Sequence, residues 1–553
     1  MRMTGVQATR TEGGVAAVDV VIVGAGFAGL YMLHRLRGLG MSAIVFEAGG
    51  GVGGTWYWNR YPGARCDVES MQYSFSFDDD LQQEWTWKER YAPQPEILTY
   101  ANHVADRFDL RRDIRFETRV TAASFDEAAQ NWTVRTDRGD VVRARYCVMA
   151  TGCLSTAKLP EIPGISSFRG KTYHTGAWPH EGVDFSGQHV GVIGTGSSGI
   201  QAIPVIAREA QHLTVFQRTP NFSVPAQNWP MTAEYERGWK QNYPERRKDA
   251  MAIRNAIRYV LNDKSALDAT EEERRREYEA RWEAGGIPFL GAFNDLILKQ
   301  QSNDTAADFV REKIRSIVRD PAVAARLTPK GYPIGTKRIC VDTDYYATFN
   351  RDNVTLVDIR SEPIEAITAD GVRTRAQSYP LDSLVFATGF DAMTGTLFAI
   401  DITGRDGLKL RDKWAEGPQT YLGLMTAGFP NMFMITGPGS PSVLTNMIVS
   451  IEQHVDWIVA CLAHLRGRDA GSIEATVEAE DAWVEHVREV GERTLYPQAN
   501  SWYVGANVPG KPRVFMPYIG GFLIYKGKCD DIAARGYAGF RLSPAASVVA
   551  AAQ

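Results

Sequence analysis

Cysteine is scarce in this sequence, and no two cysteines stand at CxxC spacing. Six cysteines are spread over 553 residues, and no group of histidines and cysteines has the spacing of a zinc site. A chain of this length can bury a core without disulfides, so we expect reduced thiols in a cytoplasmic protein. The missing pair also argues against a flavin reductase that works through a dithiol, and we expect no metal.

Long apolar runs and an excess of one charge are missing as well. Lys and Arg number 61 against 65 Asp and Glu, which gives no reason to expect nucleic acid or an anionic membrane as a partner. No segment approaches the roughly 20 consecutive apolar residues of a transmembrane helix. Residues 1–18 lack the apolar core of a signal peptide, and we expect both they and residues 544–553 to be flexible tails.

Two βαβ units with glycine-rich turns are present instead. In the first, an apolar run at 18–23 leads into Gly24-Ala25-Gly26-Phe27-Ala28-Gly29, then a helical pattern and a strand at 43–46. In the second, a run at 189–193 leads into Gly194-Thr195-Gly196-Ser197-Ser198-Gly199, a helix and a strand at 213–216. In this context the glycines let the backbone approach a pyrophosphate at the positive end of a helix. The pattern predicts an α/β protein with two Rossmann-like dinucleotide-binding domains, although a nucleotide-free tight turn is the alternative for each unit.

The end of the second strand distinguishes the two units. Glu47 stands there in the first unit, and a carboxylate would accept hydrogen bonds from both ribose hydroxyls and repel a 2′-phosphate. This residue fits FAD or NAD. In the second unit the corresponding stretch is Gln217-Arg218-Thr219, in which a cation and a hydroxyl suit the 2′-phosphate of NADP(H).

A second glycine-rich loop favours FAD over NAD in the first unit. This loop ends in Gly54-Thr55-Trp56. The segments Ala150-Thr151-Gly152 and Ala387-Thr388-Gly389 each follow an apolar strand. Such elements resemble those of flavoenzymes with paired Rossmann domains.

Strand signals vanish between the two halves of the second unit, and charged helical segments replace them. In 271–276, Glu271/Arg275 and Glu272/Arg276 stand at the i,i+4 spacing of helix-stabilising ion pairs on a solvated face. We therefore expect a helical insertion in the NADP domain. The expected domains are an FAD-binding domain at 19–152 and 390–543, an NADP-binding domain at 153–224 and 334–389, and the insertion at 225–333.

A short pattern just ahead of the second glycine turn carries a family resemblance. Phe168, Gly170, His174 and Trp178, followed by Pro179, form an FxGxxxHxxxWP pattern. It resembles the fingerprint of Type I Baeyer–Villiger monooxygenases, and the resemblance extends over roughly residues 19 to 543. In that family the segment links the domains and couples their movement to catalysis, so His174 and Trp178 need not touch substrate. Ordinary packing is the alternative for both.

The resemblance implies a reaction with two halves. NADPH reduces FAD, and O2 then gives a C4a-peroxyflavin that attacks a ketone and forms an ester or lactone through a tetrahedral adduct. This chemistry needs a fixed cation and a dry site. Arg338 is the candidate cation and Asp67 the carboxylate that orients it, with a surface salt bridge or a pyrophosphate contact as the alternative. Lys337 is expected to join Arg218 and Thr219 on the 2′-phosphate.

Within the family, the loop 437–447 and the segment 66–70 are most similar to those of phenylacetone and steroid monooxygenases, which favours bulky, aryl or steroid-like ketones. The resemblance further implies residues around the flavin (Asp67, Tyr73 and Met447), over NADP (Trp502) and at the substrate pocket (Cys153, Val443 and Leu444). Cys153 departs from the family pattern, since relatives vary at this position.

Two other functions fit parts of the sequence. Flavin-containing monooxygenases that oxidise sulfides or amines share the framework but usually lack the terminal Trp-Pro. A nucleotide-binding sensor that holds FAD without turnover is the second alternative. We expect a ketone and O2 as partners, and a monomer or small homo-oligomer.

Overall fold

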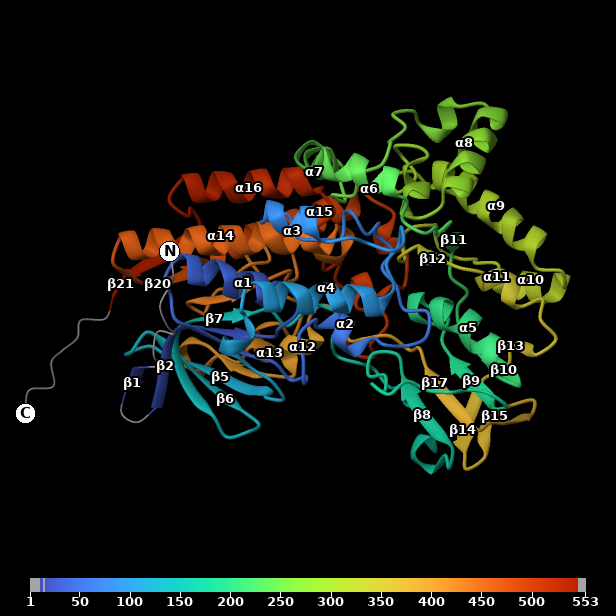
Figure 1. Ribbon diagram of the computed structural model, residues 1–553, viewed down its shortest axis with the longest axis horizontal. Coiled ribbons are helices and arrows are strands. Elements are labelled where there is room, and N and C mark those ends of the chain that lie inside the picture. The colour runs from blue at the N-terminus through green and yellow to red at the C-terminus, as the bar shows by residue number, and fades with distance from the viewer. Residues whose placement is uncertain (1–9, 13–14, 546–553) are drawn as a thin grey trace, which may run out of the picture.

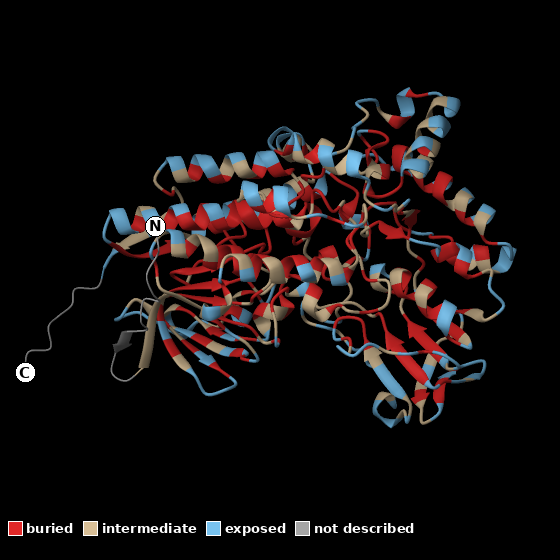
Figure 2. Cartoon of the chain, in the orientation of Figure 1, coloured by how far each residue is buried: buried red, intermediate tan, exposed pale blue. Residues whose placement is uncertain are grey.

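The computed structural model describes residues 10–12 and 15–545. It consists of two main β-sheets and a group of helices. Figure 1 shows the larger sheet under a layer of long helices, the smaller sheet at the opposite end, and helices of the middle of the chain above the smaller sheet. Buried residues concentrate in the strands and in the helix layer directly above the larger sheet (Figure 2). The chain therefore forms the expected α/β architecture.

The larger sheet has the strand order β18-β5-β6-β7-β2-β3-β4, with β1 beside β2 and β19 beside β7. β2, β3, β4, β7 and β19 run parallel, whereas β5 and β6 form an antiparallel meander on β7. The strands are β1 (Arg10–Glu12), β2 (Val15–Val23), β3 (Ala43–Phe46), β4 (Ile114–Arg115), β5 (Val120–Asp126), β6 (Asn131–Thr136), β7 (Val141–Met149), β18 (Asp401–Thr403) and β19 (Met432–Met434). The end of β2, residues 20–23, is buried because helices cover this parallel part of the sheet.

Helices from both ends of the chain cover this sheet. α1 packs against α14, and α16 packs on the far side of α14 (Figure 1). The helices of this part are α1 (Phe27–Gly38), α2 (Thr55–Trp58), α3 (Asp79–Glu84), α4 (Gln94–Arg107), α12 (Gly395–Phe398), α13 (Leu410–Lys413), α14 (Met447–Gly467), α15 (Val477–Glu492) and α16 (Phe522–Ala534). The antiparallel pair β20 (Ala470–Ala475) and β21 (Phe540–Pro544) closes the end of the layer.

The smaller sheet is parallel throughout, in the order β13-β10-β9-β17-β8. Its strands are β8 (Lys171–His174), β9 (His189–Ile193), β10 (His212–Gln217), β13 (Val354–Asp358) and β17 (Ser383–Phe386). α5 (Ser197–Glu209) connects β9 to β10, and α11 (Tyr345–Thr348) packs on α5. A small antiparallel sheet of β14 (Ile364–Thr368), β15 (Gly371–Thr374) and β16 (Ser378–Pro380) lies before β17.

The segment between the halves of this unit is mainly helical. It comprises α6 (Ala233–Lys240), α7 (Tyr243–Ala252), α8 (Glu271–Ala284), α9 (Gln300–Ile317) and α10 (Pro321–Leu327). The parallel pair β11 (Ser223–Pro225) and β12 (Cys340–Asp342) joins its two ends to each other. Single turns of 3-10 helix lie at η1 (Arg111–Asp113), η2 (Ile165–Ser167), η3 (Ala266–Asp268), η4 (Ile287–Gly291), η5 (Arg405–Gly407), η6 (Ser442–Leu444), η7 (Tyr496–Gln498) and η8 (Trp502–Val504).

Two local expectations differ from the structure. β1 and the first part of β2 fall within residues 1–18, which we expected to be flexible; residues 1–9 and 13–14 lie outside the described residues. Ala16 and Ala17 of β2 pair with Val142 and Arg143 of β7, a contact that local sequence does not reveal. At the other end, β21 extends to Pro544, and residues 546–553 of the expected tail lie outside the described residues.

The second difference concerns the charges of α8. Glu271, Glu272, Arg275 and Arg276 are exposed, as expected for a solvated face. The expected i,i+4 ion pairs are nevertheless absent from the described residues, since Arg275 pairs with Glu312 of the neighbouring α9 at 3.3 Å. The helix start is stabilised by a capping box between Thr270 and Glu273 instead.

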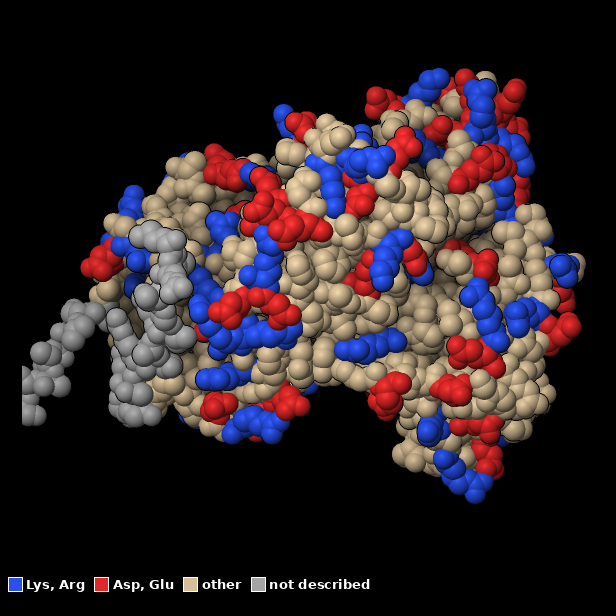
Figure 3. Space-filling model, viewed as in Figure 1, with Lys and Arg blue, Asp and Glu red and all other residues tan. Residues whose placement is uncertain are grey.

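The surface has no large region of one charge on the face that Figure 3 shows, where acidic and basic side chains are interspersed. Among the described residues, no helix combines the length and the hydropathy that crossing a bilayer requires.

Candidate active site

The first glycine turn lies between β2 and α1, and close packing explains its glycines. Gly24 has φ +105°, and a Cβ there would lie 2.6 Å from the carbonyl oxygen of Ala150. A Cβ on Gly29 would collide with the carbonyl oxygen of Gly24. A Cβ on Gly54, in the second glycine loop, would lie 2.9 Å from the Cα of Gly26 at the start of α1. The two loops therefore form one backbone cradle.

Glu47 ties this cradle together at the end of β3. Its carboxylate accepts hydrogen bonds from the backbone N–H groups of Ala25 and Gly49, both at 2.7 Å. Burial raises the pKa of Glu47, while the two backbone donors oppose that rise. The carboxylate lies at the strand end where an adenosine ribose binds in this fold.

Aromatic side chains surround the cradle. The ring of Tyr73 lies 6.1 Å from that of Phe27 and 5.9 Å from that of Trp56, both edge-on, and the Trp56 indole donates to the Tyr73 hydroxyl at 3.2 Å. Thr55 is exposed at the start of α2, and Met447 is half-buried at the start of α14. Phe27, Trp56 and Tyr73, which were expected beside a flavin, thus form one cluster.

The second glycine turn repeats the construction between β9 and α5. Gly194 has φ +112°, and its Cβ would collide with the carbonyl oxygen of Ala387; a Cβ on Gly199 would collide with that of Gly194. A Cβ on Gly196 would meet no atom within 4 Å, so this glycine faces open space. Ser197 and Ser198 form the first turn of α5, where free N–H groups point outward.

The strand end beside this turn carries cations. Arg218 is exposed and Lys337 is half-buried, and neither has an acidic partner among the ion pairs of the described residues. Burial and then the charge of Arg218 lower the pKa of Lys337, whose Nζ lies 4.6 Å from the ring centre of Tyr332. The backbone carbonyl of Thr219 accepts a hydrogen bond from the Thr195 hydroxyl at 3.1 Å. Two unneutralised cations suit a phosphate dianion.

The sequence did not point to a third cation near this strand end. Burial and then the charge of Arg218 also lower the pKa of Lys158. Lys158 donates to the backbone carbonyl of Asn507, which joins it to the loop that follows Trp502. Trp502 is half-buried, with its ring centre 4.1 Å from that of Tyr503.

Arg338 and Asp67 form a bidentate pair, although 271 residues separate them. Arg338 Nε donates to Asp67 Oδ2 at 2.9 Å, and Nη2 donates to Oδ1 at 2.8 Å. Arg338 Nη1 donates to the carbonyl oxygen of Val443 at 3.1 Å. Burial alone would lower the pKa of Arg338, but the Asp67 carboxylate together with Tyr503 and Tyr496 holds that pKa above its ordinary value. The guanidinium is therefore permanently charged and fixed in orientation.

A cavity of about 250 Å³ begins at Arg338. Leu444, Tyr496, Tyr503 and Ile519 line it on the side of the larger domain, Gly335 and Ile339 line it beside Arg338, and residues between 253 and 297 of the helical insertion line the rest. Cys153 and Val443 are not among its lining residues but belong to the same hydrophobic cluster as Leu444. Burial raises the pKa of Cys153 to about 11, so its thiol is protonated at neutral pH.

Of the fingerprint residues, Trp178 contacts the larger domain, whereas Phe168 packs in the hydrophobic cluster of the smaller sheet. The Phe168 ring packs against Gly170, where a Cβ would lie 2.6 Å from that ring. His174 Nδ1 accepts a hydrogen bond from Gly176 at 2.9 Å, so Nε2 carries the proton and faces the carbonyl oxygen of Lys158 at 3.3 Å. The Trp178 backbone N–H donates to Trp58, which lies in the larger domain, at 3.4 Å.

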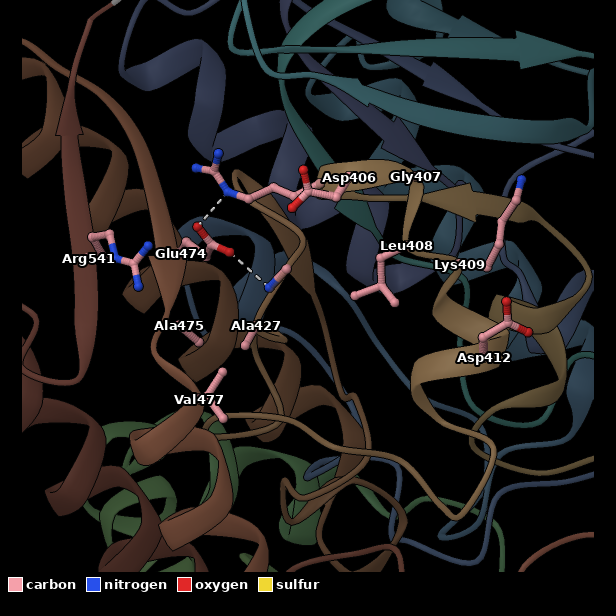
Figure 4. A pocket seen from close by; sticks show the side chains of 12 residues that line it. Asp406, Gly407, Leu408, Lys409, Asp412, Ala427, Glu474, Ala475, Val477 and Arg541 are labelled. Carbon is pink, nitrogen blue, oxygen red and sulfur yellow. Dashed lines mark hydrogen bonds and ion pairs between the residues drawn. The ribbon is translucent and has the colours of Figure 1, made fainter.

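A larger hollow, of about 490 Å³, lies away from both cradles. In Figure 4 it is walled by Glu474 and Val477 on one side and by Leu408, Lys409 and Asp412 on the other. Glu474 is engaged by the Arg405 side chain and the Gly428 N–H, both at 2.9 Å. Arg338 lines the smaller cavity and does not line this hollow, so the smaller cavity is the candidate active site. No group of side chains suited to a metal ion occurs in 10–12 and 15–545.

Sequence analysis did not identify the insertion residues that line the cavity. It also did not identify Tyr496, Tyr503 or Lys158. Lys158 stands six residues after the 150–152 segment, and Tyr503 directly follows Trp502, so proximity to these motifs was the available signal. The insertion residues have no such signal, because long-range packing brings them to the cavity.

Comparisons with known proteins agree with this geometry. A model of the pyridine nucleotide-disulphide oxidoreductase family matches residues 21–237, which include both glycine turns. All six cysteines of this chain are free and buried, so the match reflects the nucleotide-binding fold rather than a redox disulfide.

Full-length relatives are more specific. A Baeyer-Villiger monooxygenase of Pseudooceanicola batsensis is 44% identical over 533 residues, 96% of each chain. The structure of an oxidised steroid monooxygenase bound to NADP is 54% identical, with a TM-score of 0.92 over 96% of this chain and 100% of that chain. The structure of OTEMO in complex with FAD and NADP is 42% identical, with a TM-score of 0.92 over 95% and 99% of the two chains. The chain therefore belongs to the Baeyer–Villiger monooxygenase family.

Proposed function

We propose that this protein uses FAD and NADPH to insert one oxygen atom of O2 beside the carbonyl group of a ketone. The overall reaction converts ketone, O2, NADPH and a proton into an ester or lactone, NADP+ and water. The observation that carries the proposal is the Arg338 guanidinium, which Asp67 holds in a fixed orientation on the wall of the cavity.

The first cradle fits FAD. Gly26 and Gly54 bring the two glycine loops into backbone contact at the start of α1, where free N–H groups suit a pyrophosphate, and Glu47 stands at the ribose end. Phe27 and Tyr73 supply an aromatic wall beside the cradle. When bound, FAD that has been reduced by NADPH supplies the activated oxygen of the reaction.

The second cradle fits NADPH. Gly196 leaves open space for the pyrophosphate, and Arg218, Thr219 and Lys337 supply charge and hydrogen-bond donors for the 2′-phosphate. Trp502 lies at the edge of the cluster that surrounds Cys153 and Leu444, where it can cover the coenzyme.

Arg338 stabilises negative charge as it develops on the oxygen of the substrate carbonyl. Because Asp67 occupies one edge of the guanidinium, the remaining N–H groups keep a fixed direction. No free energy is then needed to reorient these donors during the reaction. The apolar wall at Leu444 and Ile519 excludes water from this end of the cavity. Trp178 acts as a positioning residue, since its backbone N–H donates across the domain junction to Trp58, and His174 acts within the NADP domain, where its ring faces the carbonyl oxygen of Lys158.

Product analysis tests the proposal. Purified protein with FAD and NADPH is given cyclic, aryl and steroidal ketones, and the products are analysed by mass spectrometry. We expect esters or lactones one oxygen heavier than the ketones, with bulky ketones preferred. Oxidation of a sulfide but of no ketone would assign the protein to the heteroatom-oxidising alternative, and a yellow protein that leaves NADPH untouched would assign it to the sensor.

We further propose that the protein acts in the cytoplasm as a monomer or small homo-oligomer. All six cysteines are free and buried, which suits a reducing compartment. Size-exclusion chromatography with light scattering measures the oligomeric state, and a large assembly would contradict this proposal.

A further inference from the structure

The cavity at Arg338 has one closed and one open end. At the closed end, Leu444 and Tyr503 are 9% and 1% exposed. At the other end, Leu261 is 45% exposed, and Asp263 beside it is exposed as well. The cavity therefore leads from the candidate reaction centre toward solvent along the helical insertion.

Exposed apolar side chains gather at the open end. The described residues include nine large hydrophobic side chains that are exposed. Five of them are the lining residue Leu261 itself or stand within two residues in sequence of Tyr259, Ile297 or Phe522, which line the cavity or bond to a lining residue. We call these five the apolar rim: Val260, Leu261, Leu298, Leu523 and Ile524. Single exposed apolar residues are ordinary, but a gathering around one opening marks a binding surface.

The placement of the rim follows from the lining residues. Val260 lies between the lining residues Tyr259 and Leu261, and Leu298 follows the lining residue Ile297. The first turn of α16, which carries Leu523 and Ile524, is held at the opening from the other domain. There the Phe522 N–H donates to the carbonyl oxygen of the lining residue Arg254 at 2.9 Å. Figure 1 shows this end of α16 beside α7.

The volume of the cavity limits what fits inside it. Sites that enclose drug-sized ligands measure roughly 300–1,000 Å³, and this cavity measures about 250 Å³. A larger ketone with its carbonyl at Arg338 would therefore extend through the opening. Arg254 and Asp263 bring one charge of each sign there, which favours an uncharged tail.

We propose that the apolar rim binds the distal part of the substrate, and that the preferred substrates are uncharged ketones with an extended apolar tail. This inference rests on the proposed function, because the position of the carbonyl at Arg338 sets the length of tail that reaches the rim. Val260, at 78% exposed, and Ile524, at 58%, gain most from such a tail because they lose most contact with water.

A homologous series of methyl ketones, from 2-hexanone to 2-dodecanone, tests the inference. In the wild-type protein kcat/KM is expected to rise with chain length, by up to about fourfold for each methylene that becomes buried. In the double variant Val260→Asn/Ile524→Asn the rise is expected to stop at the chain length that reaches the rim. The matched control Leu408→Asn/Val477→Asn, at two exposed apolar positions of the other hollow, keeps the wild-type profile.

The outcomes separate this inference from the proposed function. If no ketone of any length gives an ester, the proposed function fails. If esters form but kcat/KM is flat with chain length, or if the double variant keeps the wild-type profile, the inference about the rim is overturned. A double variant that keeps the wild-type profile overturns the inference even if it loses binding to lipid vesicles or loses self-association. The rim would then bind a partner other than the substrate.

Discussion

The two dinucleotide cradles share a construction and differ at the strand end. In each, the first glycine has a positive φ and packs against the carbonyl oxygen of an alanine at the end of a neighbouring strand, Ala150 or Ala387. The first cradle then ends in Glu47 and the second in Arg218. On our proposal, the shared backbone places the pyrophosphate in each cradle, and the single side chain selects the ribose that binds there.

The two cradles also differ in how far their strand-end residues are buried. Glu47 is 5% exposed and holds two backbone N–H groups, so it belongs to the packed interior. Arg218 is exposed, and Lys337 lies near it without an acidic partner among the ion pairs of the described residues. This difference fits a cofactor that stays bound in the first cradle and a coenzyme that exchanges in the second.

The largest expected effect comes from Arg338, which lies in neither glycine turn. Arg338→Ala is expected to lower the rate of ester formation by about 10²–10³, the cost of losing one preorganised oxyanion stabiliser. Reduction of FAD by NADPH should continue, because Arg338 takes no part in either ribose site. Stopped-flow absorbance measures the reduction, and chromatography measures the ester.

The control for this variant is Arg208→Ala, which removes an exposed arginine of α5 that pairs with Asp344. It should leave both rates unchanged. Normal ester formation by Arg338→Ala would remove this guanidinium from the mechanism and leave the two cradles without a reaction centre between them.

The next largest effect tests whether the strand-end residue of the second cradle selects the coenzyme. Arg218→Ala is expected to raise the KM for NADPH by about 10- to 100-fold, since a hydrogen bond to a charged group contributes about 1.5–3 kcal/mol. The KM for NADH should change less than about twofold, because NADH has no 2′-phosphate for this charge to contact. Equal losses for both coenzymes would show that the second cradle does not distinguish them through Arg218.

The corresponding change in the first cradle acts on FAD. Glu47→Gln removes the charge and is expected to weaken FAD binding by about tenfold, the effect of one charge-assisted hydrogen bond. Flavin fluorescence during titration of the apoprotein gives the Kd, with the exposed Glu416→Gln as the matched control. A loss of NADPH affinity in place of FAD affinity would reverse our assignment of the cradles.

The smallest effect is a pH dependence confined to the second cradle. Burial and the neighbouring charge of Arg218 lower the pKa of Lys337, so in the free protein this side chain loses its proton at a lower pH than an ordinary lysine. The KM for NADPH should therefore rise a fewfold as pH rises through that lowered pKa, whereas the KM for NADH stays flat. In Lys337→Arg the rise should disappear; its persistence would assign the titration to another group.

Sequence predicted those parts of the fold that local patterns determine. The strands at 43–46 and 189–193 coincide with β3 and β9, because short apolar runs bounded by glycine turns leave little freedom. The start of β2 was missed, since pairing with β7, more than a hundred residues away, holds it in the sheet.

The candidate site shows the same division. Glu47 and Arg218 followed from their spacing after a glycine turn. The contact between Asp67 and Arg338 was expected only from the family resemblance, because 271 residues separate them. The cavity wall at Tyr259 and Leu261 could not be predicted, because it depends on how the insertion packs against the rest of the chain.

Turnover of a ketone under ¹⁸O2 tests the central claim most directly. The account predicts that each molecule of ester carries one ¹⁸O atom beside the original carbonyl carbon, and that one NADPH is consumed for each ester formed. An ester without ¹⁸O, or NADPH oxidation that yields only hydrogen peroxide with every ketone, would contradict the claim that Arg338 and the two cradles together direct oxygen into a carbon–carbon bond.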